Sequence, residues 1–231
     1  MKAFTFKRFE IQQSKEVFRV GTDGVLLGAL ADGNHALNVL EIGTGTGLIS
    51  LMLAQRNPDA GFLAIDISRE AADLAGLNFR HSPFSGRLQA VHQDLKHFIT
   101  EEKFDLIVSN PPYFEASDSE KDKVARQTVE LNFGQLVSKS SELLSEGGIL
   151  SVIIPVEAGE GFIKETGKNG LFLIRRISIK GITYADPKRL LLEFSNVERE
   201  LEESEFIIEK SPRQYSDQYL ELTKEFHVFR K

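Results

Sequence analysis

Short apolar runs alternate with amphipathic stretches over the first two thirds of the chain. The apolar runs predict buried strands, and the amphipathic stretches predict helices. The strands are expected at residues 37–42, 62–66, 88–92, 104–109 and 149–154, and the helices at 48–55, 69–79 and 131–144. The last of these helices is expected to stop at Gly147-Gly148. Continuously apolar strands that alternate with helices are typical of a parallel sheet covered on both faces.

The last third of the chain has a different pattern. Strand-like runs at 172–179, 189–194 and 205–209 follow one another without long helices between them, which predicts antiparallel pairing at a sheet edge. Residues 216–226 are expected to form a terminal helix or an extended tail. About 35 residues precede the first core strand, too few for a separate recognition domain. We therefore expect one domain over 37–231, with a leader over 1–36 that packs on it.

Composition excludes several kinds of site. The chain has no cysteine, so disulfides, thiolate metal sites and a cysteine nucleophile are ruled out. Its five histidines form no helical pair at metal-ligand spacing, and we expect no bound metal. No apolar run reaches the roughly 18 residues that span a bilayer, and the N-terminus has no apolar signal core. We expect a cytoplasmic protein that does not bind membranes.

The net charge of −6 argues mildly against a nucleic-acid partner. The charge is uneven, however, because residues 198–205 hold five acids and one base and so leave only −2 for the rest of the chain. We expect an acidic hairpin there, which leaves room for a basic face elsewhere, since the local field matters more than the total charge.

A glycine-rich turn follows the first core strand. Gly43, Gly45 and Gly47 allow a sharp turn and a close approach of a ligand to the main chain. Leu48 occupies the place where a dinucleotide-binding loop needs glycine or alanine. The carboxylate of Glu41, just before the turn, would repel a pyrophosphate but suits a cationic ligand such as S-adenosylmethionine (SAM). A nicotinamide-dependent oxidoreductase is therefore disfavoured.

Acidic residues end the next two strands. Asp66 lies 19 residues past Gly47, the distance at which a carboxylate accepts hydrogen bonds from ribose hydroxyls. Capping of the following helix by Asp66 or Ser68 is the alternative. Asp94, after the third strand, is expected to accept from the exocyclic amine of the cofactor's adenine, although a solvated turn explains it equally well.

The segment Asn110-Pro111-Pro112-Tyr113, after the fourth strand, indicates the reaction. An aromatic amine is a poor nucleophile because its lone pair is delocalised. The Asn110 side-chain oxygen and the Pro111 carbonyl can hold its two N–H bonds and direct the lone pair at a methyl group. The prolines fix the direction of the carbonyl, and the Tyr113 ring offers a base a stacking face worth about 1–3 kcal/mol.

These residues resemble the class I SAM-dependent methyltransferases, and more closely the bacterial tRNA(Val) adenine-N6 methyltransferases that modify the adenosine next to the anticodon. The resemblance covers nearly the whole chain and is carried by residues 18–28, 41–47, 110–114, 187–190 and 215–223. It implies a Rossmann-like, mostly parallel seven-stranded sheet with an antiparallel edge and a small C-terminal addition of strands and a helix. It also implies that Thr22, Asp23 and Gly24 lie near the methionine end of SAM.

The same resemblance implies tRNA as the substrate, and we expect a monomer. Because the chain is acidic, RNA binding must rest on local basic patches. Arg175 and Arg176 are secondary candidates for phosphate contacts. The main candidates are Lys121, Lys123, Arg126, Lys188, Arg189 and Arg213.

Other reactions use similar chemistry. A glutamine-N5 methyltransferase of peptide release factors shares the Asn-Pro-Pro-Tyr segment, but such enzymes carry a helical domain before the glycine turn. A guanine-N2 rRNA methyltransferase is the next alternative, and Tyr113 in place of phenylalanine weighs against it. DNA adenine methylation usually brings a target-recognition domain. A SAM-binding but inactive RNA-binding module is the alternative outside enzymes, and the intact Asn110 and Tyr113 argue against it.

Overall fold

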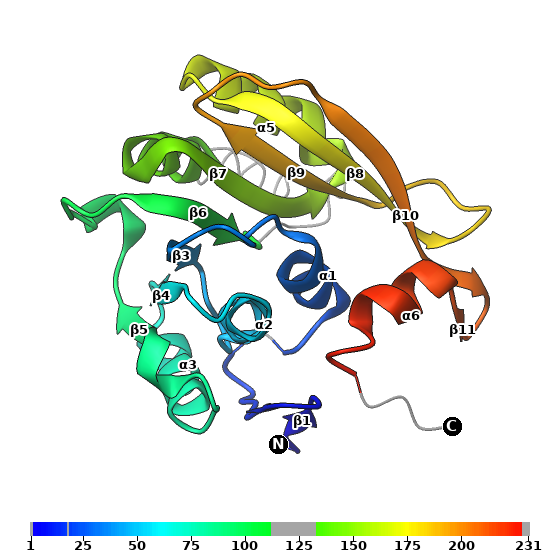
Figure 1. Ribbon diagram of the computed structural model, residues 1–231, viewed down its shortest axis with the longest axis horizontal. Helices are drawn as coiled ribbons and strands as arrows, with labels where there is room; N and C mark the ends of the chain where they lie inside the picture. The colour runs from blue at the N-terminus through cyan, green and yellow to red at the C-terminus, as the bar shows by residue number, and fades with distance from the viewer. Residues whose placement is uncertain (1, 18, 112–132, 228–231) are drawn as a thin grey trace, which may run out of the picture.

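The computed structural model describes residues 2–17, 19–111 and 133–227, and every structural statement below concerns these residues. A single large sheet forms the centre of the molecule (Figure 1). Its parallel part runs in the order β5–β4–β3–β6–β7. These strands are β3 (Asn38–Ile42), β4 (Gly61–Asp66), β5 (Leu88–His92), β6 (Phe104–Ser109) and β7 (Leu144–Pro155).

The antiparallel edge follows β7. Strand β9 (Arg189–Ser195) pairs antiparallel with β7, and β8 (Phe172–Ile182) pairs antiparallel with β9, which confirms the predicted seven-stranded arrangement. Strands β10 (Glu202–Ser211) and β11 (Gln214–Tyr215) then extend the same sheet to nine described strands.

The prediction for β10 was wrong in direction. Both sides of β9 are occupied, so β10 takes the outer edge of β8 and runs parallel to it. The acidic segment 198–205 is therefore no hairpin: it leads into β10, where Glu203 and Glu205 meet Arg176 and Lys180 of β8 at 3.2 and 2.9 Å. The bases of β8 thus neutralise part of the acidic run.

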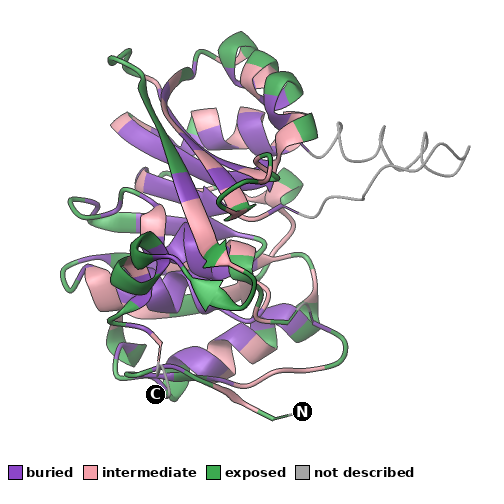
Figure 2. Ribbon diagram, turned by 90° about the vertical axis from the view of Figure 1, so that its right-hand side faces the viewer, coloured by how far each residue is buried: buried purple, intermediate pink, exposed green. Residues whose placement is uncertain are grey.

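Helices cover both faces of the sheet (Figure 1). On one face lie α1 (Thr22–Leu30), α2 (Leu48–Arg56), α3 (Arg69–Arg80) and α6 (Asp217–Thr223), and on the other lie α5 (Val156–Lys168) and the helical residues 133–143. Side chains alternate along each strand, so that in β6 Leu106 and Val108 pack in one core cluster and Ile107 in the other. This explains the continuous apolar runs of the central strands, such as residues 106–108 of β6, and Figure 2 shows the buried layers that result.

The structure differs from the predicted elements at Gly147-Gly148 and at α5. The helix over 133–143 ends where β7 begins, and Gly147-Gly148 lies inside that strand rather than after a helix. Gly147 has a φ of +73°, and the pairing of β6 with β7 shifts register there, so the glycines form a bulge. The helix α5 was not predicted. Short 3₁₀ turns at η1 (Ser85–Arg87) and η2 (Leu95–His97) flank β5.

The N-terminal segment forms a small ribbon of β1 (Phe4–Thr5) and β2 (Glu10–Ile11). It lies beside the C-terminal segment, because the Lys7 N–H donates to the Phe226 carbonyl at 2.8 Å (Figure 1). The Asn78 amide of α3 bonds both the N–H and the carbonyl of Gln12 and also the Thr46 carbonyl, at 2.8, 3.2 and 2.9 Å. The leader is thereby fastened next to the glycine turn.

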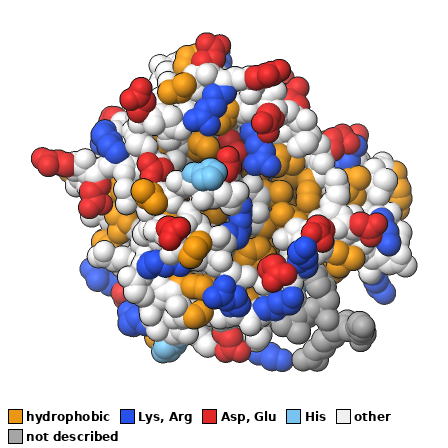
Figure 3. Space-filling view, viewed as in Figure 1, with side chains coloured by type: hydrophobic (Ala, Val, Ile, Leu, Met, Phe, Trp, Pro, Cys, Tyr) orange, Lys and Arg blue, Asp and Glu red, His pale blue; other side chains and the backbone are white. Residues whose placement is uncertain are grey.

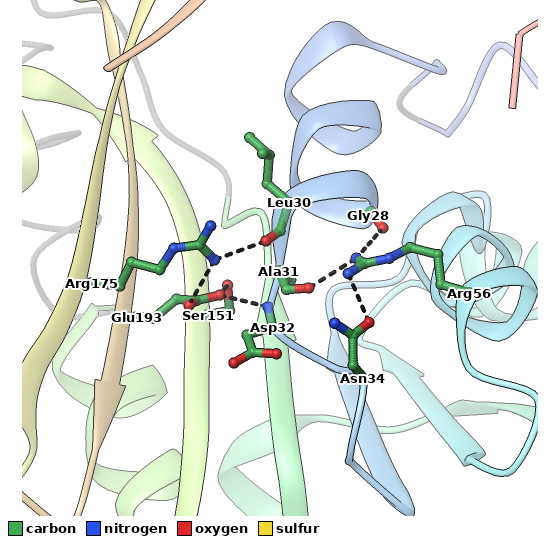
Figure 4. A network of polar contacts seen from close by, with 9 residues as sticks. All are labelled: Gly28, Leu30, Ala31, Asp32, Asn34, Arg56, Ser151, Arg175 and Glu193. Atoms are coloured by element: carbon green, nitrogen blue, oxygen red, sulfur yellow. Dashed lines mark hydrogen bonds and ion pairs between the residues drawn. The ribbon is translucent and has the colours of Figure 1, made fainter. Parts of the chain in front are cut away.

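A buried polar network holds the C-terminal end of α1 against the sheet (Figure 4). Glu193 of β9 is 1% exposed and pairs with Arg175 of β8 at 3.2 Å. Its other oxygen accepts from the Ser151 hydroxyl at 3.0 Å and the Asp32 N–H at 2.8 Å. Arg175 also donates to the Leu30 carbonyl at 3.1 Å. From the other side, Arg56 bonds the carbonyls of Gly28 and Ala31 and the side chain of Asn34.

Candidate functional site

The C-terminal ends of four parallel strands bring the main predicted residues to one edge of the sheet. The N–H groups of Gly43 and Thr44, after β3, donate to the Ile65 carbonyl of β4 at 2.9 and 3.1 Å. The Gln93 N–H, after β5, donates to the Asp66 carbonyl at 2.8 Å. The Ser109 hydroxyl, just before Asn110, donates to the Ile42 carbonyl at 2.9 Å. In a parallel α/β sheet, ligands bind at this edge.

The three glycines of the turn have different roles. All have positive φ, at +76° for Gly43, +55° for Gly45 and +79° for Gly47. A Cβ on Gly47 would lie 2.5 Å from the Phe79 ring, so this glycine is needed for packing against α3. A Cβ on Gly43 or Gly45 would have no atom within 4 Å. The open space over Gly43 and Gly45 leaves room for a ligand at the main chain, and cofactor binding there stays a prediction.

Glu41 is the buried acid of the site, at 1% exposure. Its Oε2 accepts from the Thr44 hydroxyl at 3.0 Å, from the Ser50 N–H at 3.1 Å and from the Ser50 hydroxyl. Its Oε1 is buried and has no hydrogen-bond partner among the described residues. Burial raises the pKa of Glu41 to about 7, although the bonds from Ser50 and Thr44 oppose the shift. A cation next to Oε1 would restore the ionised form.

The raised pKa of Glu41 predicts a pH dependence of stability. The folded protein holds this proton up to about pH 7, whereas the unfolded chain releases it near pH 4.5. The resulting stabilisation is complete below pH 4.5 and is lost as the pH rises to 7. At about 1.4 kcal/mol per pKa unit it amounts to about 3 kcal/mol.

Urea unfolding of the wild type and Glu41→Gln at pH 5 and pH 8 checks this expectation. Groups common to both proteins cancel in the comparison. Relative to the variant, the wild type should lose about 3 kcal/mol of unfolding free energy over this range. Equal pH slopes would show that Glu41 is ionised throughout.

The Asp66 carboxylate lies at the C-terminal edge of the sheet and also holds the glycine turn in place. One oxygen accepts from the Gly45 N–H and the other from the Ser68 N–H, both at 2.9 Å. The N-cap of α3 is Ser68, whose hydroxyl accepts from the Ala71 N–H at 3.2 Å. Asp94 caps η2 through the Lys96 N–H at 2.9 Å and lies 3.2 Å from His97. Each carboxylate oxygen can still accept from a ligand hydroxyl or amine.

The leader residues begin α1 close to the same edge. Thr22 is exposed, and the Asp23 carboxylate pairs with Arg189 Nε at 2.9 Å. Arg189 stands opposite Pro155, at the C-terminal end of β7. Packing against α2 explains the glycine at position 24, since a Cβ there would lie 3.2 Å from the Leu48 side chain. Asp23, predicted for the cofactor, and Arg189, predicted for RNA, thus lie together.

Asn110 directly follows β6, beside the glycine turn. Its Oδ1 atom is buried and has no hydrogen-bond partner among the described residues, and the Pro111 that follows is buried. A buried polar atom without a partner is rare and costs about 1–3 kcal/mol, which points to a ligand that satisfies it. Pro112 and Tyr113 lie outside the described residues, as do Lys121, Lys123 and Arg126.

The other predicted RNA contacts are scattered. Lys188 and Arg213 are exposed, at the start of β9 and in the turn between β10 and β11. Arg175 belongs to the buried network, and Arg176 pairs with Glu203. Phosphate contacts by these two arginines stay a prediction. On the face seen in Figure 3, basic and acidic side chains are interspersed.

Sequence reasoning missed several buried polar residues, two in the site and one in the network at the end of α1. Ser50 was hidden in the apolar helix α2, and Ser109 at the end of the apolar β6. Glu193 is the single charged residue inside the apolar run 190–194. In each case, a lone polar residue in an apolar element was the available signal, because a buried polar group needs a partner.

Neither a membrane-spanning helix nor a group of three metal-ligating side chains is found in the part of the chain that the structure describes.

A family model described as "Methyltransferase small domain" matches residues 13–161. A protein of Flavobacteriaceae bacterium (strain 3519-10), named tRNA1(Val) (adenine(37)-N6)-methyltransferase, is 56% identical over 230 residues, which cover 99% of this chain and 100% of the relative.

Solved structures of methyltransferases share the fold. A predicted O-methyltransferase from Agrobacterium tumefaciens superimposes with a TM-score of 0.70 at 20% identity, over 88% of this chain and 96% of the other. The N-methyltransferase NodS from Bradyrhizobium japonicum, in complex with S-adenosyl-L-homocysteine, gives a TM-score of 0.54 at 23% identity, over 75% and 84%.

Proposed function

The chain belongs to the methyltransferase small domain family and to the tRNA1(Val) (adenine(37)-N6)-methyltransferases, and we propose that it methylates N6 of adenine 37 in tRNA1(Val) with SAM as the methyl donor. The observation that carries the proposal is the buried Asn110 Oδ1, which lacks a partner among the described residues at the edge where the glycine turn lies. An adenine amine is the kind of donor that this acceptor needs. The enzyme is proposed to act on tRNA in the cytoplasm as a monomer.

The residues of the edge fit SAM. When bound, SAM supplies an electrophilic methyl group on a sulfonium. Gly43 and Gly45 leave open space over the main chain, and Glu41 offers a buried oxygen without a described partner to the cationic end of the cofactor. Asp66 and Asp94 have further acceptor capacity for its ribose hydroxyls and its adenine amine. Thr22 and Asp23 are proposed to lie near its methionine end.

Asn110 and Pro111 are proposed to hold the target amine. The Asn110 oxygen accepts one N–H bond and the Pro111 carbonyl accepts the other, which turns the nitrogen lone pair out of the ring and toward the methyl donor. Both acceptors are set before the reaction: the Ser109 hydroxyl anchors this strand end to β3, and proline fixes the backbone angle at 111. Their catalytic contribution is positioning and electrostatic stabilisation. Stacking of the base on Tyr113 stays a prediction.

Replacing Asp66 by asparagine is expected to weaken SAM binding at least about tenfold. The change removes a charged acceptor, and a hydrogen bond to a charged group is worth about 1.5–3 kcal/mol. Calorimetric titration of the folded variant with SAM measures the effect.

Asp105→Asn is the matched control for Asp66→Asn. Asp105 also accepts from two backbone N–H groups, those of Leu37 and Asn38, but it lies at the opposite edge of the sheet. Both variants should lose some stability, and only Asp66→Asn should lose SAM affinity. Equal SAM affinities in the two variants would assign Asp66 a purely structural role.

A radiolabelled methyl-transfer assay tests the proposed function. Purified protein is offered tRNA, a peptide release factor and duplex DNA in parallel, and the labelled tRNA is digested to locate N6-methyladenosine. We expect label on adenine 37 of tRNA1(Val) alone. Label on a glutamine of the release factor, with tRNA blank, would replace this proposal by the glutamine-N5 alternative.

Phosphate contacts are proposed for Lys188, Arg189 and Arg213 and for the loop residues Lys121, Lys123 and Arg126. Activity should then fall steeply as salt is added, because each phosphate contact releases counterions. Charge reversal at Lys188 should raise KM for tRNA without changing SAM affinity. A KM that is independent of salt would show that RNA binding does not rest on these bases.

A further inference from the structure

A cleft of about 320 Å³ lies between the start of α1 and the β10–β11 hairpin. Besides Gly21 and Thr22, its lining consists of rings and aliphatic side chains, contributed by Phe4, Val20, Val25, Tyr215, Tyr219 and His227. Tyr215 is 43% exposed and stacks on Tyr219 with ring centroids 4.5 Å apart and an interplanar angle of 22°. Ligand sites start at about 300 Å³, so the volume of the cleft suits one planar base, and its lining offers aromatic rings together with polar atoms.

The cleft opens at the edge of the sheet that carries the proposed active site. Gly21 and Thr22 form part of its lining, and the next residue, Asp23, pairs with Arg189 at the end of β7. The hairpin follows the C-terminal end of β10, four strands from β6 in the sheet. At the usual strand spacing this separation is about 19 Å. A folded RNA whose target base lies at Asn110 can therefore also reach the cleft.

Arg213 occupies an unfavourable backbone conformation two residues before Tyr215. It follows Pro212 with a φ of 65°, at a turn position that favours glycine. Its N–H donates to Glu209 at 3.1 Å, whereas its guanidinium makes no hydrogen bond or ion pair with any described residue. Glycine would fit this position without strain, so the arginine is held there at a steric cost. Such a cost is understandable if the side chain binds a ligand.

We propose that this cleft is a second nucleotide subsite, in which a base of the substrate RNA other than the target adenine stacks against Tyr215 and a phosphate pairs with Arg213. The inference rests on the proposed function, since it assumes a structured RNA substrate. Aromatic rings bind any base through its face, and an arginine recognises phosphate without regard to sequence. The subsite therefore adds affinity for the RNA and places it relative to Asn110.

Tyr215→Ala is expected to raise KM for tRNA about tenfold, within the range for the loss of one base–aromatic stack. The kcat at saturating tRNA and the SAM affinity should stay unchanged, because the residue touches neither the methyl donor nor the target amine. Tyr215→Phe should restore the wild-type KM. Phe172→Ala is the control, since Phe172 is also 43% exposed but begins β8 at the opposite edge.

The Arg213→Gly variant distinguishes a role of Arg213 in tRNA binding from a role in the stability of the fold. Glycine relieves the strain, so the thermal midpoint should stay equal or rise, while KM for tRNA increases and the slope of log KM against log salt falls by about 1. A purely structural role would move stability instead of KM and the salt slope.

The outcomes distinguish this inference from the proposed function. If the wild-type enzyme methylates tRNA and both Tyr215→Ala and Arg213→Gly keep the wild-type KM, the subsite is rejected and the function stands. A rise in KM of the same size for Phe172→Ala would also reject it. If the wild type methylates no tRNA, the proposed function fails, and with it the premise of the subsite.

Discussion

Replacing Asn110 by alanine is expected to lower the rate of methyl transfer to tRNA by about a hundredfold or more, the usual cost of losing one preorganised polar group in the transition state. The cofactor residues Glu41, Gly43, Gly45 and Asp66 come from β3 and β4 and do not depend on the Asn110 amide. SAM affinity should therefore survive. The stability of the variant should equal or exceed that of the wild type, because a buried oxygen without a described partner is removed.

Single-turnover methylation and calorimetric SAM binding on the same preparation separate the two effects. Asn169→Ala is a suitable control, because its amide bonds only the Glu165 carbonyl, at the end of α5. Near-normal turnover in Asn110→Ala would mean that the segment after β6 is only a rigid turn. Loss of SAM affinity equal to the loss of rate would assign Asn110 to the cofactor instead of the base.

Glu193→Ala is expected to lower the free energy of unfolding by about 3–5 kcal/mol, because it leaves the partly buried Arg175 without its partner charge. It also removes the acceptor of the Ser151 hydroxyl and the Asp32 N–H, both close to the end of α1. Urea unfolding measures the effect.

The neighbouring pair Arg176–Glu203 provides the control. It joins the same strand β8 to β10 at the same distance of 3.2 Å, but Glu203 is 56% exposed. Glu203→Ala should cost about 1 kcal/mol or less, as exposed ion pairs do. The double change Arg175→Met with Glu193→Leu should be less damaging than Glu193→Ala alone, because it leaves no unpaired buried charge. A similar cost for Glu193→Ala and Glu203→Ala would contradict the role of burial.

The local sequence was sufficient for the central strands and for the chemistry of the edge. Strands β5 and β6 were predicted at their observed bounds. Residues 106–108 of β6 are buried on both faces, which explains their continuous apolar run, whereas β5 lies at the end of the sheet and has no buried residue. Gly43 and Asn110 follow parallel strands and Asp66 ends one, and parallel strands end at one edge, so their assembly followed from the pattern alone.

Tertiary contacts decided the direction of β10, the need for Gly47 and the different partners of two adjacent arginines, none of which the local pattern indicates. The chain could not indicate that β10 would run parallel to β8, because that direction depends on β9 already lying between β7 and β8. Nor could it indicate that Gly47 is required by the Phe79 ring, which is brought there by α3. Two adjacent arginines, Arg175 and Arg176, look equivalent in sequence, yet one faces a buried acid and the other a solvated one.

The sequence by itself determined the class of fold and the edge of the sheet at which the proposed site residues gather, because periodicity and motif spacing are local properties of the chain. Only the tertiary structure decided the raised pKa of Glu41, the pairing of Asp23 with Arg189 and the cleft beside Tyr215. Burial, ion pairing and cavity shape depend on residues far apart in the chain, and each is set by which of them the packed sheet brings into contact.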